Sequence, residues 1–358
     1  MIFAPFPLVP GREKYMRRNF IAILFLLIGN ANSQAQTEPF YKGKTITIVT
    51  GFSTGSIFDL VARATAQYWG KHIPGNPNII VQNMPGAGSV VAANYIYGVA
   101  KPDGLTLGSI SSGIYSDQLV GRKEVQFDWA KFTWIGSSDQ TNQILIVRAD
   151  TAYKSLEDIR RAAEPPRCGA MGTGTATYYV PKLMEDVLGF KLNVITGYPG
   201  APEIDLAIEK GEMHCRGGTV EAIFGREPGR TWVKTGFVKV LVQSGTERDP
   251  RLPDSPTIWE IMDKEKLPES SKRLATVILA AGFFGRPIVG PPGIAPDRLK
   301  ILRESYLKTM TDPDFSAEAK KRRWELTPVS GEKLEVRAKD VIAQPPEVIE
   351  RMKKLLGN

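Results

Sequence analysis

The sequence has few of the residues that most often carry catalysis or hold metal ions. Its 358 residues include only two cysteines, Cys168 and Cys215, and two histidines, His72 and His214. Four residues at these spacings do not make a persuasive zinc site. No H-E-x-x-H sequence occurs, and neither histidine has an obvious nucleophile or metal-binding partner. We therefore predict no metal site and no catalytic residues.

Nucleotide-binding signatures are missing as well. The chain contains no G-x-x-x-x-G-K-[ST] sequence. The G-x-G sequences in residues 86–91 and 172–177 lack the third glycine of the dinucleotide motif, and no acidic residue ends the next predicted strand. The formal net charge is +8, but the basic residues are dispersed and form no stripe with aromatic residues. The sequence thus predicts no cofactor and no nucleic-acid partner, while the positive excess suits an anionic ligand.

Long hydrophobic runs are absent after residue 36, so no later segment is predicted to span a membrane. Near the N-terminus, Arg17 and Arg18 precede the apolar run FIAILFLLI, and small polar residues follow it. This order is typical of a secretory signal peptide, which we place at residues 1–35, with Met16 as an alternative start. An uncleaved membrane anchor is the other interpretation. Cleavage would leave the protein in the periplasm.

Strand and helix patterns alternate along the rest of the chain. A β-branched run at residues 45–50 precedes a glycine-rich turn and a helical pattern, and this order repeats further on. Such alternation predicts parallel βαβ units and an α/β fold. We expect two lobes joined by two crossings, with residues 37–140 plus 254–358 in the first and 141–253 in the second. The apolar segment 276–284 is a further strand candidate.

Four glycine-rich loops follow predicted strands and precede predicted helices, at residues 51–56, 83–89, 172–177 and 198–201. In parallel α/β sheets, ligands bind beyond the carboxyl ends of the strands. Glycine lets the backbone approach a ligand, and the N–H groups at a helix N-terminus attract an anion. Tight turns with helix caps are the alternative interpretation of each loop. Asp59 has the same two interpretations, as a cap of the first helix or as a ligand contact.

The two cysteines occupy similar positions in two predicted strands. Cys168 lies four residues before Gly172, and Cys215 lies four residues before Thr219. The two strands could be neighbours in one sheet, although a disulfide across adjacent parallel strands is geometrically awkward. The sequence is compatible with a disulfide and with two buried free thiols.

Several segments resemble the tripartite tricarboxylate transporter receptor family, also called the Bug receptors. The segment KTITIVTGFSTGSIFDLVARATAQYW is similar to that family's first strand, loop, Asp and helix. The segment IIVQNMPGAGSVVAANYIYGVAKPDGLTLG keeps its N-x-x-G-A-G run and its P-D-G-x-T-L ending. The segment GYPGAPEIDLAIEKGEMHCRGG matches a pattern of its second lobe. The resemblance spans about residues 40–358.

This resemblance implies a two-lobed periplasmic-binding-protein fold of type II, the Venus-flytrap fold, which closes on a small organic carboxylate. It also implies delivery of that ligand to the two membrane subunits of a tripartite tricarboxylate-type transporter, without a cofactor. We expect a monomer. A ligand-sensing receptor for a signalling partner and an exported enzyme remain the alternatives.

The loop pattern and the resemblance together give a set of predicted ligand-binding residues. They are Phe52, Ser53, Thr54, Gly55, Ser56, Asp59, Gly86, Ala87, Gly172, Thr173, Gly174, Thr175, Thr177, Tyr178, Gly200 and Ala201. Ser56 stands where the family commonly has a second glycine, and Tyr178 where many members have histidine. These departures leave the ligand open and favour a wider or more aromatic pocket.

Overall fold

The computed structural model describes residues 38–357, so the predicted signal peptide lies outside the described residues. The described chain contains two mixed sheets. The first has the order β11-β4-β10-β3-β1-β2, with β1 (Thr45–Thr50), β2 (Asn78–Asn83), β3 (Thr106–Ser109), β4 (Thr133–Ser137), β10 (Pro287–Gly290) and β11 (Val329–Ser330). The second has the order β7-β6-β8-β5-β9, with β5 (Gln143–Arg148), β6 (Arg167–Gly169), β7 (Asn193–Ile195), β8 (Cys215–Thr219) and β9 (Val238–Gln243).

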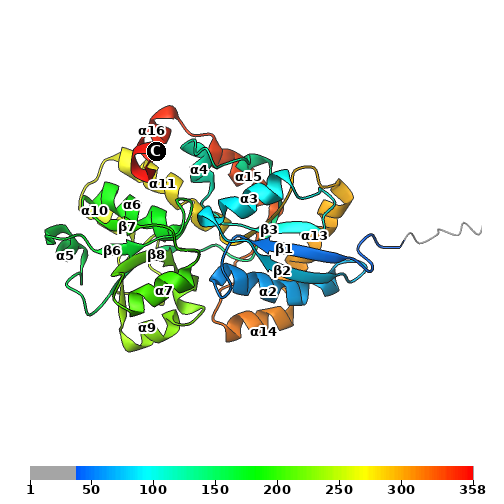
Figure 1. The fold of residues 1–358 in the computed structure, drawn as a ribbon, viewed down its shortest axis with the longest axis horizontal. Helices are drawn as coiled ribbons and strands as arrows, with labels where there is room; N and C mark the ends of the chain where they lie inside the picture. The colour runs from blue at the N-terminus through cyan, green and yellow to red at the C-terminus, as the bar shows by residue number, and fades with distance from the viewer. Residues whose placement is uncertain (1–37, 358) are drawn as a thin grey trace, which may run out of the picture. The chain divides into compact units, whose positions relative to one another are not determined.

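Helices cover both sheets, and Figure 1 shows α2 and α14 on one face of the first sheet with α3 and α15 on the other. The first sheet carries α2 (Ile57–Trp69), α3 (Val90–Gly98), α4 (Tyr115–Leu119), α13 (Pro296–Met310), α14 (Pro313–Lys321) and α15 (Gly331–Ile342). Around the second lie α5 (Leu156–Arg161), α6 (Ala176–Leu188), α7 (Ala201–Glu209), α8 (Val220–Phe224), α9 (Gly229–Thr235) and α10 (Ile258–Lys264). The remaining α-helices of the described residues are α11 (Glu269–Leu279), α12 (Ala281–Phe284) and α16 (Pro346–Leu356).

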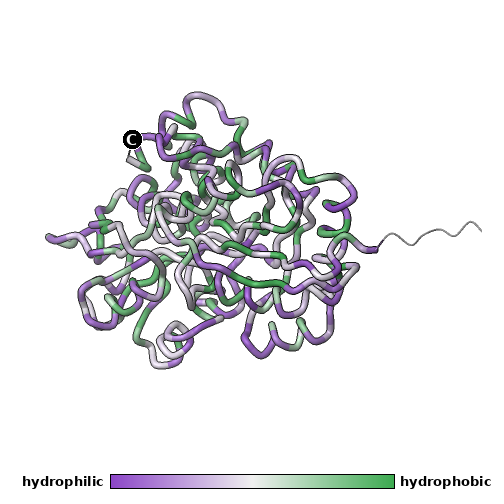
Figure 2. Tube along the Cα trace, turned by 45° about the vertical axis from the view of Figure 1, so that its right-hand side comes forward, coloured by the Kyte–Doolittle hydropathy of each residue, from purple (hydrophilic) through white to green (hydrophobic). Residues whose placement is uncertain are grey.

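Burial on both faces explains the composition of the strands. Strand β5 (QILIVR) is buried over nearly its whole length, as is β4, because helices exclude water from both sides of each sheet. In Figure 2 the hydrophobic stretches lie mostly inside the trace and hydrophilic residues mark the outer turns. Among the described residues, no helix has the length and apolar character needed to cross a membrane.

The chain crosses between the two sheets twice. It leaves β4 for β5 through residues 138–142 and returns from α11 to β10 through residues 280–286. The two crossings lie side by side, since the Thr141 amide donates a hydrogen bond to the Gly282 carbonyl at 2.9 Å. The return crossing follows α10 and α11, whereas the sequence suggested a boundary after residue 253. We keep the lobe limits that the sequence predicts, with boundaries near residues 140 and 253, as a proposal.

The predicted strand at residues 276–284 is wrong, because this segment forms the end of α11 and the short helix α12. Its apolar residues are buried on several sides, so neither strand nor helix periodicity shows in so short a run. Two consecutive alanines, Ala280 and Ala281, favour the helical alternative.

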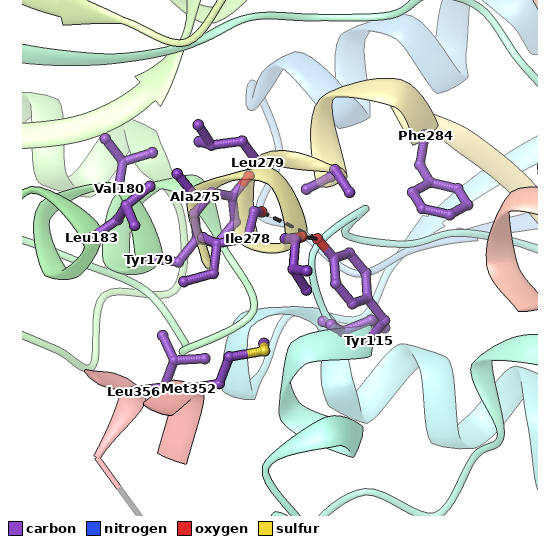
Figure 3. Close-up of a cluster of buried hydrophobic side chains, with 14 of the residues drawn as sticks. Tyr115, Tyr179, Val180, Leu183, Ala275, Ile278, Leu279, Phe284, Met352 and Leu356 are labelled. Carbon is purple, nitrogen blue, oxygen red and sulfur yellow. Dashed lines mark hydrogen bonds between the residues drawn. The ribbon is translucent and has the colours of Figure 1, made fainter. Parts of the chain in front are cut away.

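Beside the crossings, helices from distant parts of the chain share one hydrophobic cluster. Figure 3 shows Tyr115 of α4, Tyr179 of α6, Ile278 of α11 and Leu356 of α16 within it. The Tyr115 hydroxyl donates to the Val277 carbonyl at 2.5 Å, which satisfies a polar group in an otherwise apolar cluster. The C-terminal helix therefore packs against a helix of the second sheet.

A disulfide joins Cys168 of β6 to Cys215 of β8. The two residues are register partners in neighbouring parallel strands, and their Cα atoms are 4.4 Å apart. This distance lies within the range that a disulfide can bridge. The parallel pairing of β6 with β8 consists of this residue pair, so the disulfide reinforces a short contact in the sheet.

Replacing both Cys168 and Cys215 by Ala should lower the free energy of unfolding by about 4 kcal/mol. The cross-link spans a sequence separation of 47 residues and restricts the unfolded chain. Urea denaturation measures the loss, and the reduced wild-type protein controls for the missing sulfur atoms. Equal stability of the oxidised wild type and the double variant would contradict this account.

Candidate ligand-binding site

The loops at the carboxyl ends of parallel strands from both sheets enclose a cavity of about 60 Å³. Residues of the first sheet and its loops contribute Phe52, Ser56, Phe58, Ser111, Ser112 and Arg286 to the wall. Residues of the second contribute Met171, Thr175, Thr177, Tyr179, Ala201, Arg216 and Thr219. The cavity is small beside ordinary ligand pockets, which measure roughly 300–1,000 Å³.

Three helices begin at this cavity. Ile57 of α2, Ala176 of α6 and Ala201 of α7 are the first residues of their helices, and all three line the wall. The first N–H groups of a helix have no acceptor within the helix, and the helix dipole gives this end a partial positive charge. Both effects favour an anionic group in the cavity.

The loop before α2 is held in shape by Asp59. This buried carboxylate accepts hydrogen bonds from the Gly55 amide at 2.9 Å, from Asn83 Nδ2 at 2.8 Å and from Arg63 Nε at 2.9 Å. Burial alone would raise the pKa of Asp59, but these hydrogen bonds hold it below its ordinary value. Asp59 is not part of the cavity wall, so the structure supports the capping interpretation.

Aromatic side chains form the side of the wall next to α2. The rings of Phe52 and Phe58 stack with centroids 4.1 Å apart, and the Arg286 guanidinium lies 5.8 Å from the Phe58 ring. Tyr179 lines the opposite side, and its hydroxyl accepts a hydrogen bond from Gln143 at 3.3 Å. The cavity thus combines an aromatic surface with polar helix ends.

The threonines of the loop before α6 shape that loop. The Thr175 hydroxyl donates to the Gly172 carbonyl at 2.7 Å, and the Thr177 hydroxyl accepts from the Met171 amide at 3.0 Å. The two hydroxyls are 2.8 Å apart. These contacts fix the turn in front of α6, whose first residue lines the cavity.

The loops of the two lobes touch through their backbones. A Cβ atom on Gly172 would lie 2.5 Å from the Ala87 carbonyl carbon, and one on Gly88 would lie 2.7 Å from the Gly172 Cα atom. Next to this contact, the Ser111 hydroxyl donates to the Gly174 carbonyl at 2.8 Å. Only glycine at these positions permits so close an approach.

A second contact between the lobes lies at the start of α7. The Ser53 hydroxyl donates to Glu203 at 3.2 Å. A Cβ atom on Gly200 would lie 1.9 Å from the Ser53 Oγ atom, so this contact also requires glycine. The sequence 51–55 (GFSTG) has the G-x-S-x-G spacing of serine hydrolases with Ser53 at its centre.

Neither histidine is placed to activate Ser53. His72 pairs with Asp312 at 2.9 Å, and a ring nitrogen of His214 accepts from the Arg167 amide at 3.2 Å. Within residues 38–357, no group of three or more His, Cys, Asp or Glu side chains is placed to hold a metal ion.

The structure separates the predicted binding residues into three groups. Those in the cavity wall are Phe52, Ser56, Thr175, Thr177 and Ala201. Those in contacts between the lobes are Ser53, Ala87, Gly172, Thr173, Gly174 and Gly200. Those outside both are Thr54, Gly55, Asp59, Gly86 and Tyr178. Tyr178 points away from the cavity and donates to the Leu356 carbonyl at 3.1 Å, while its neighbour Tyr179 lines the wall.

Two buried arginines in the wall were not predicted. Arg216, the second residue of β8, is 1% exposed, and Arg286, just before β10, is 4% exposed. Arg286 pairs with Asp139, whose pKa burial raises and the guanidinium partly lowers again. A charged residue inside an otherwise apolar or glycine-rich strand was the available signal, because arginine is almost never fully buried without a partner or a ligand.

A buried carboxyl also links the lobes. Asp117 of α4 is 1% exposed and accepts a hydrogen bond from the Thr173 hydroxyl across the interface. Its second oxygen has no hydrogen-bond partner among the described residues. Burial raises the pKa of Asp117 to about 6, although Thr173 and the nearby Arg122 favour the charged form.

Asp117→Asn is expected to stabilise the protein at pH 7.5 by up to about 3 kcal/mol, because burial raises the pKa of the native carboxyl to about 6. The native carboxyl keeps its proton up to about pH 6, whereas the unfolded one releases it near pH 4. The ionised form therefore costs stability above pH 6, and this cost disappears as the pH falls to 4. Thermal unfolding at both pH values measures it, and a variant less stable than wild type at pH 7.5 would contradict the account.

Comparisons with solved structures show the same architecture. The chain is similar to the periplasmic binding protein BugD, with a TM-score of 0.71 and 19% identity over 88% of this chain and 98% of that chain. It is also similar to MatC from Rhodopseudomonas palustris with bound malate, with a TM-score of 0.67 and 20% identity over 88% of this chain and 99% of that chain. A third is R. palustris Rpa4515 with adipate, with a TM-score of 0.68 and 18% identity over 88% and 98%. The predicted two-lobed periplasmic-binding-protein fold is confirmed.

A profile described as the tripartite tricarboxylate transporter family receptor matches residues 61–353. This match covers most of the chain, including the second sheet, all strands of the first sheet except β1, and the helices that begin at the cavity apart from the first turn of α2. The resemblance found in the sequence is thereby confirmed, and the chain belongs to the tripartite tricarboxylate transporter receptor family.

Proposed function

We propose that this protein is an extracytoplasmic receptor that captures a small organic carboxylate between its two lobes. The observation that carries the proposal is the convergence of α2, α6 and α7 on one cavity at the contact of the lobes. Their N-terminal amides offer several hydrogen bonds and a positive potential to a single anionic group. Malate and adipate, the ligands named for two similar structures, are carboxylates.

Closure of the lobes is the second element of the proposal. The cavity is closed by the contact of Gly172 with Ala87 and Gly88 and by the contact of Ser53 with Glu203. The two crossings between the sheets are adjacent, which suits a hinge. A ligand that bridges the loops of both lobes favours the closed form, because only that form offers all its contacts at once.

We further propose that the protein delivers its ligand to the membrane subunits of a tripartite tricarboxylate-type transporter, a proposal that membership of the family supports. We place the protein in the periplasm as a monomer, after removal of residues 1–35. The disulfide between Cys168 and Cys215 supports export, since disulfides form and persist in oxidising compartments.

The proposal is tested by thermal unfolding with malate, adipate, citrate and benzoate, and with adipamide as an uncharged control. An acid that binds the folded protein at 100 times its dissociation constant adds about 2.7 kcal/mol to the free energy of unfolding. We expect at least one acid to raise the melting temperature and adipamide to leave it unchanged. The absence of a shift with all four acids would overturn the proposed function.

Gly172→Ala tests the closure. The new Cβ atom would lie 2.5 Å from the Ala87 carbonyl carbon, so the loops must stay apart, and we expect at least a tenfold loss of affinity for the acid that stabilises the wild type. Gly98→Ala is the matched control, because a Cβ atom there meets nothing within 4 Å. Titration calorimetry measures both. Wild-type affinity in the Gly172→Ala variant would show that the lobes do not close here.

A further inference from the structure

Arg216 lines the cavity and has one guanidinium nitrogen without a hydrogen-bond partner among the described residues. Its Nε atom donates to Asp205 at 2.7 Å, and its Nη1 atom donates to the Gly217 carbonyl at 3.1 Å. Its Nη2 atom has no hydrogen-bond partner among the described residues, although the side chain is 1% exposed. Arg216 is also part of the cavity wall. A buried guanidinium with a free donor is costly unless something supplies the missing acceptor.

The charges around Arg216 do not balance. Asp205 pairs with two guanidiniums, those of Arg216 and Arg226, and all three side chains are at most 3% exposed. This buried group therefore carries one surplus positive charge. Glu203 is the other acid close to Arg226, but it is only half-buried and accepts a hydrogen bond from Ser53.

Arg286, the other arginine of the cavity wall, differs from Arg216 in how its charge is compensated. It pairs one to one with the buried Asp139, so its charge is compensated within the protein. The surplus positive charge in the cavity wall therefore belongs to the Asp205 group, and Arg216 is its member that reaches the cavity.

Two glycines of β8 make room for this arrangement. A Cβ atom on Gly218 would lie 2.4 Å from Arg216 Nη1, so a side chain at that position would displace the guanidinium. A Cβ atom on Gly217 would lie 2.0 Å from the Ala176 carbonyl oxygen at the start of α6. Gly218 thus leaves room for the guanidinium along its own strand, while Gly217 lets the start of α6 approach the opposite face of β8.

We propose that Arg216 is a specificity-determining residue whose Nη2 atom donates directly to a carboxylate of the ligand. A carboxylate supplies both the missing acceptor and the missing negative charge, and a charge-assisted hydrogen bond of this kind is strong in a buried site. The inference rests on the proposed function and deepens it. Helix ends and hydroxyl groups tolerate any hydrogen-bond acceptor, whereas an uncompensated buried guanidinium selects a ligand with a full negative charge at this end.

Arg216→Gln is the direct test, with Arg226→Gln as its matched control. Each variant removes one guanidinium from Asp205 and leaves a neutral pair, but only Arg216 lies in the cavity wall. For the acid of the panel that most stabilises the wild type, we expect at least a tenfold loss of affinity in Arg216→Gln. We expect less than a threefold loss in Arg226→Gln. Arg216→Lys should recover part of the affinity, because it restores the charge without the planar fork.

Thermal unfolding without ligand separates a binding role from a structural one. If Arg216 serves the ligand, Arg216→Gln relieves an uncompensated charge, and the ligand-free variant melts at or above the wild-type temperature. A lower melting temperature together with unchanged affinity would assign Arg216 a purely structural role and overturn the inference.

Three further outcomes would each overturn the inference, and one of them would overturn the proposed function as well. Equal losses in Arg216→Gln and Arg226→Gln would overturn the inference, because the effect would then not depend on contact with the cavity. Wild-type affinity in Arg216→Gln would overturn it while leaving the proposed function intact. A wild-type protein that binds none of the four acids would overturn both proposals.

Discussion

The arrangement of the site depends on one backbone contact, that of Gly172 against Ala87 and Gly88. These residues come from the loops of different sheets, and no side chain larger than hydrogen fits at Gly172 or Gly88. The contact brings the N-terminus of α6 opposite that of α2 and closes the cavity between them. The two adjacent crossings are the covalent links between the sheets.

The pairing of buried charged side chains is the second feature on which the site depends. Asp139 with Arg286 and Asp205 with Arg226 are buried ion pairs, and each compensates the desolvation of its partner. Arg216 shares Asp205 with Arg226, and it is the member of this group that lines the cavity. Its Nη2 atom and the Nε atoms of Arg226 and Arg286 have no hydrogen-bond partner among the described residues. A receptor whose ligand completes an ionic group is bistable by construction. On the proposed function, an anion supplies an acceptor that the closed form lacks at Arg216, which links binding energy to closure.

Features that depend on residues close together in the sequence could be predicted. Strand β1 follows from its β-branched run, and the turns before α2 and α6 follow from glycine between a strand and a helix. The prediction of a strand at residues 276–284 was wrong, because a short buried apolar run shows neither strand nor helix periodicity. Tyr178 and Tyr179 are adjacent in one helix, and only the packing of α6 against α16 shows which of the two faces the cavity.

Features that depend on distant partners could not be predicted in this way. The sequence left the state of Cys168 and Cys215 open, because a disulfide requires that β6 and β8 be neighbours in register. The role of Arg216 depends on Asp205, a helix residue whose position becomes known only with the fold. Positions outside the wall, such as Asp59, were included because a cap and a ligand contact have the same sequence pattern.

The central claim is that an anion is bound at the junction of the lobes, and a crystal structure of the protein with a bound acid tests it most directly. The account predicts a carboxylate oxygen within hydrogen-bond distance of Arg216 Nη2, beside the first amides of α6. An acid bound elsewhere, for example in the groove between α11, α15 and α16, with Arg216 Nη2 still unpartnered, would contradict it.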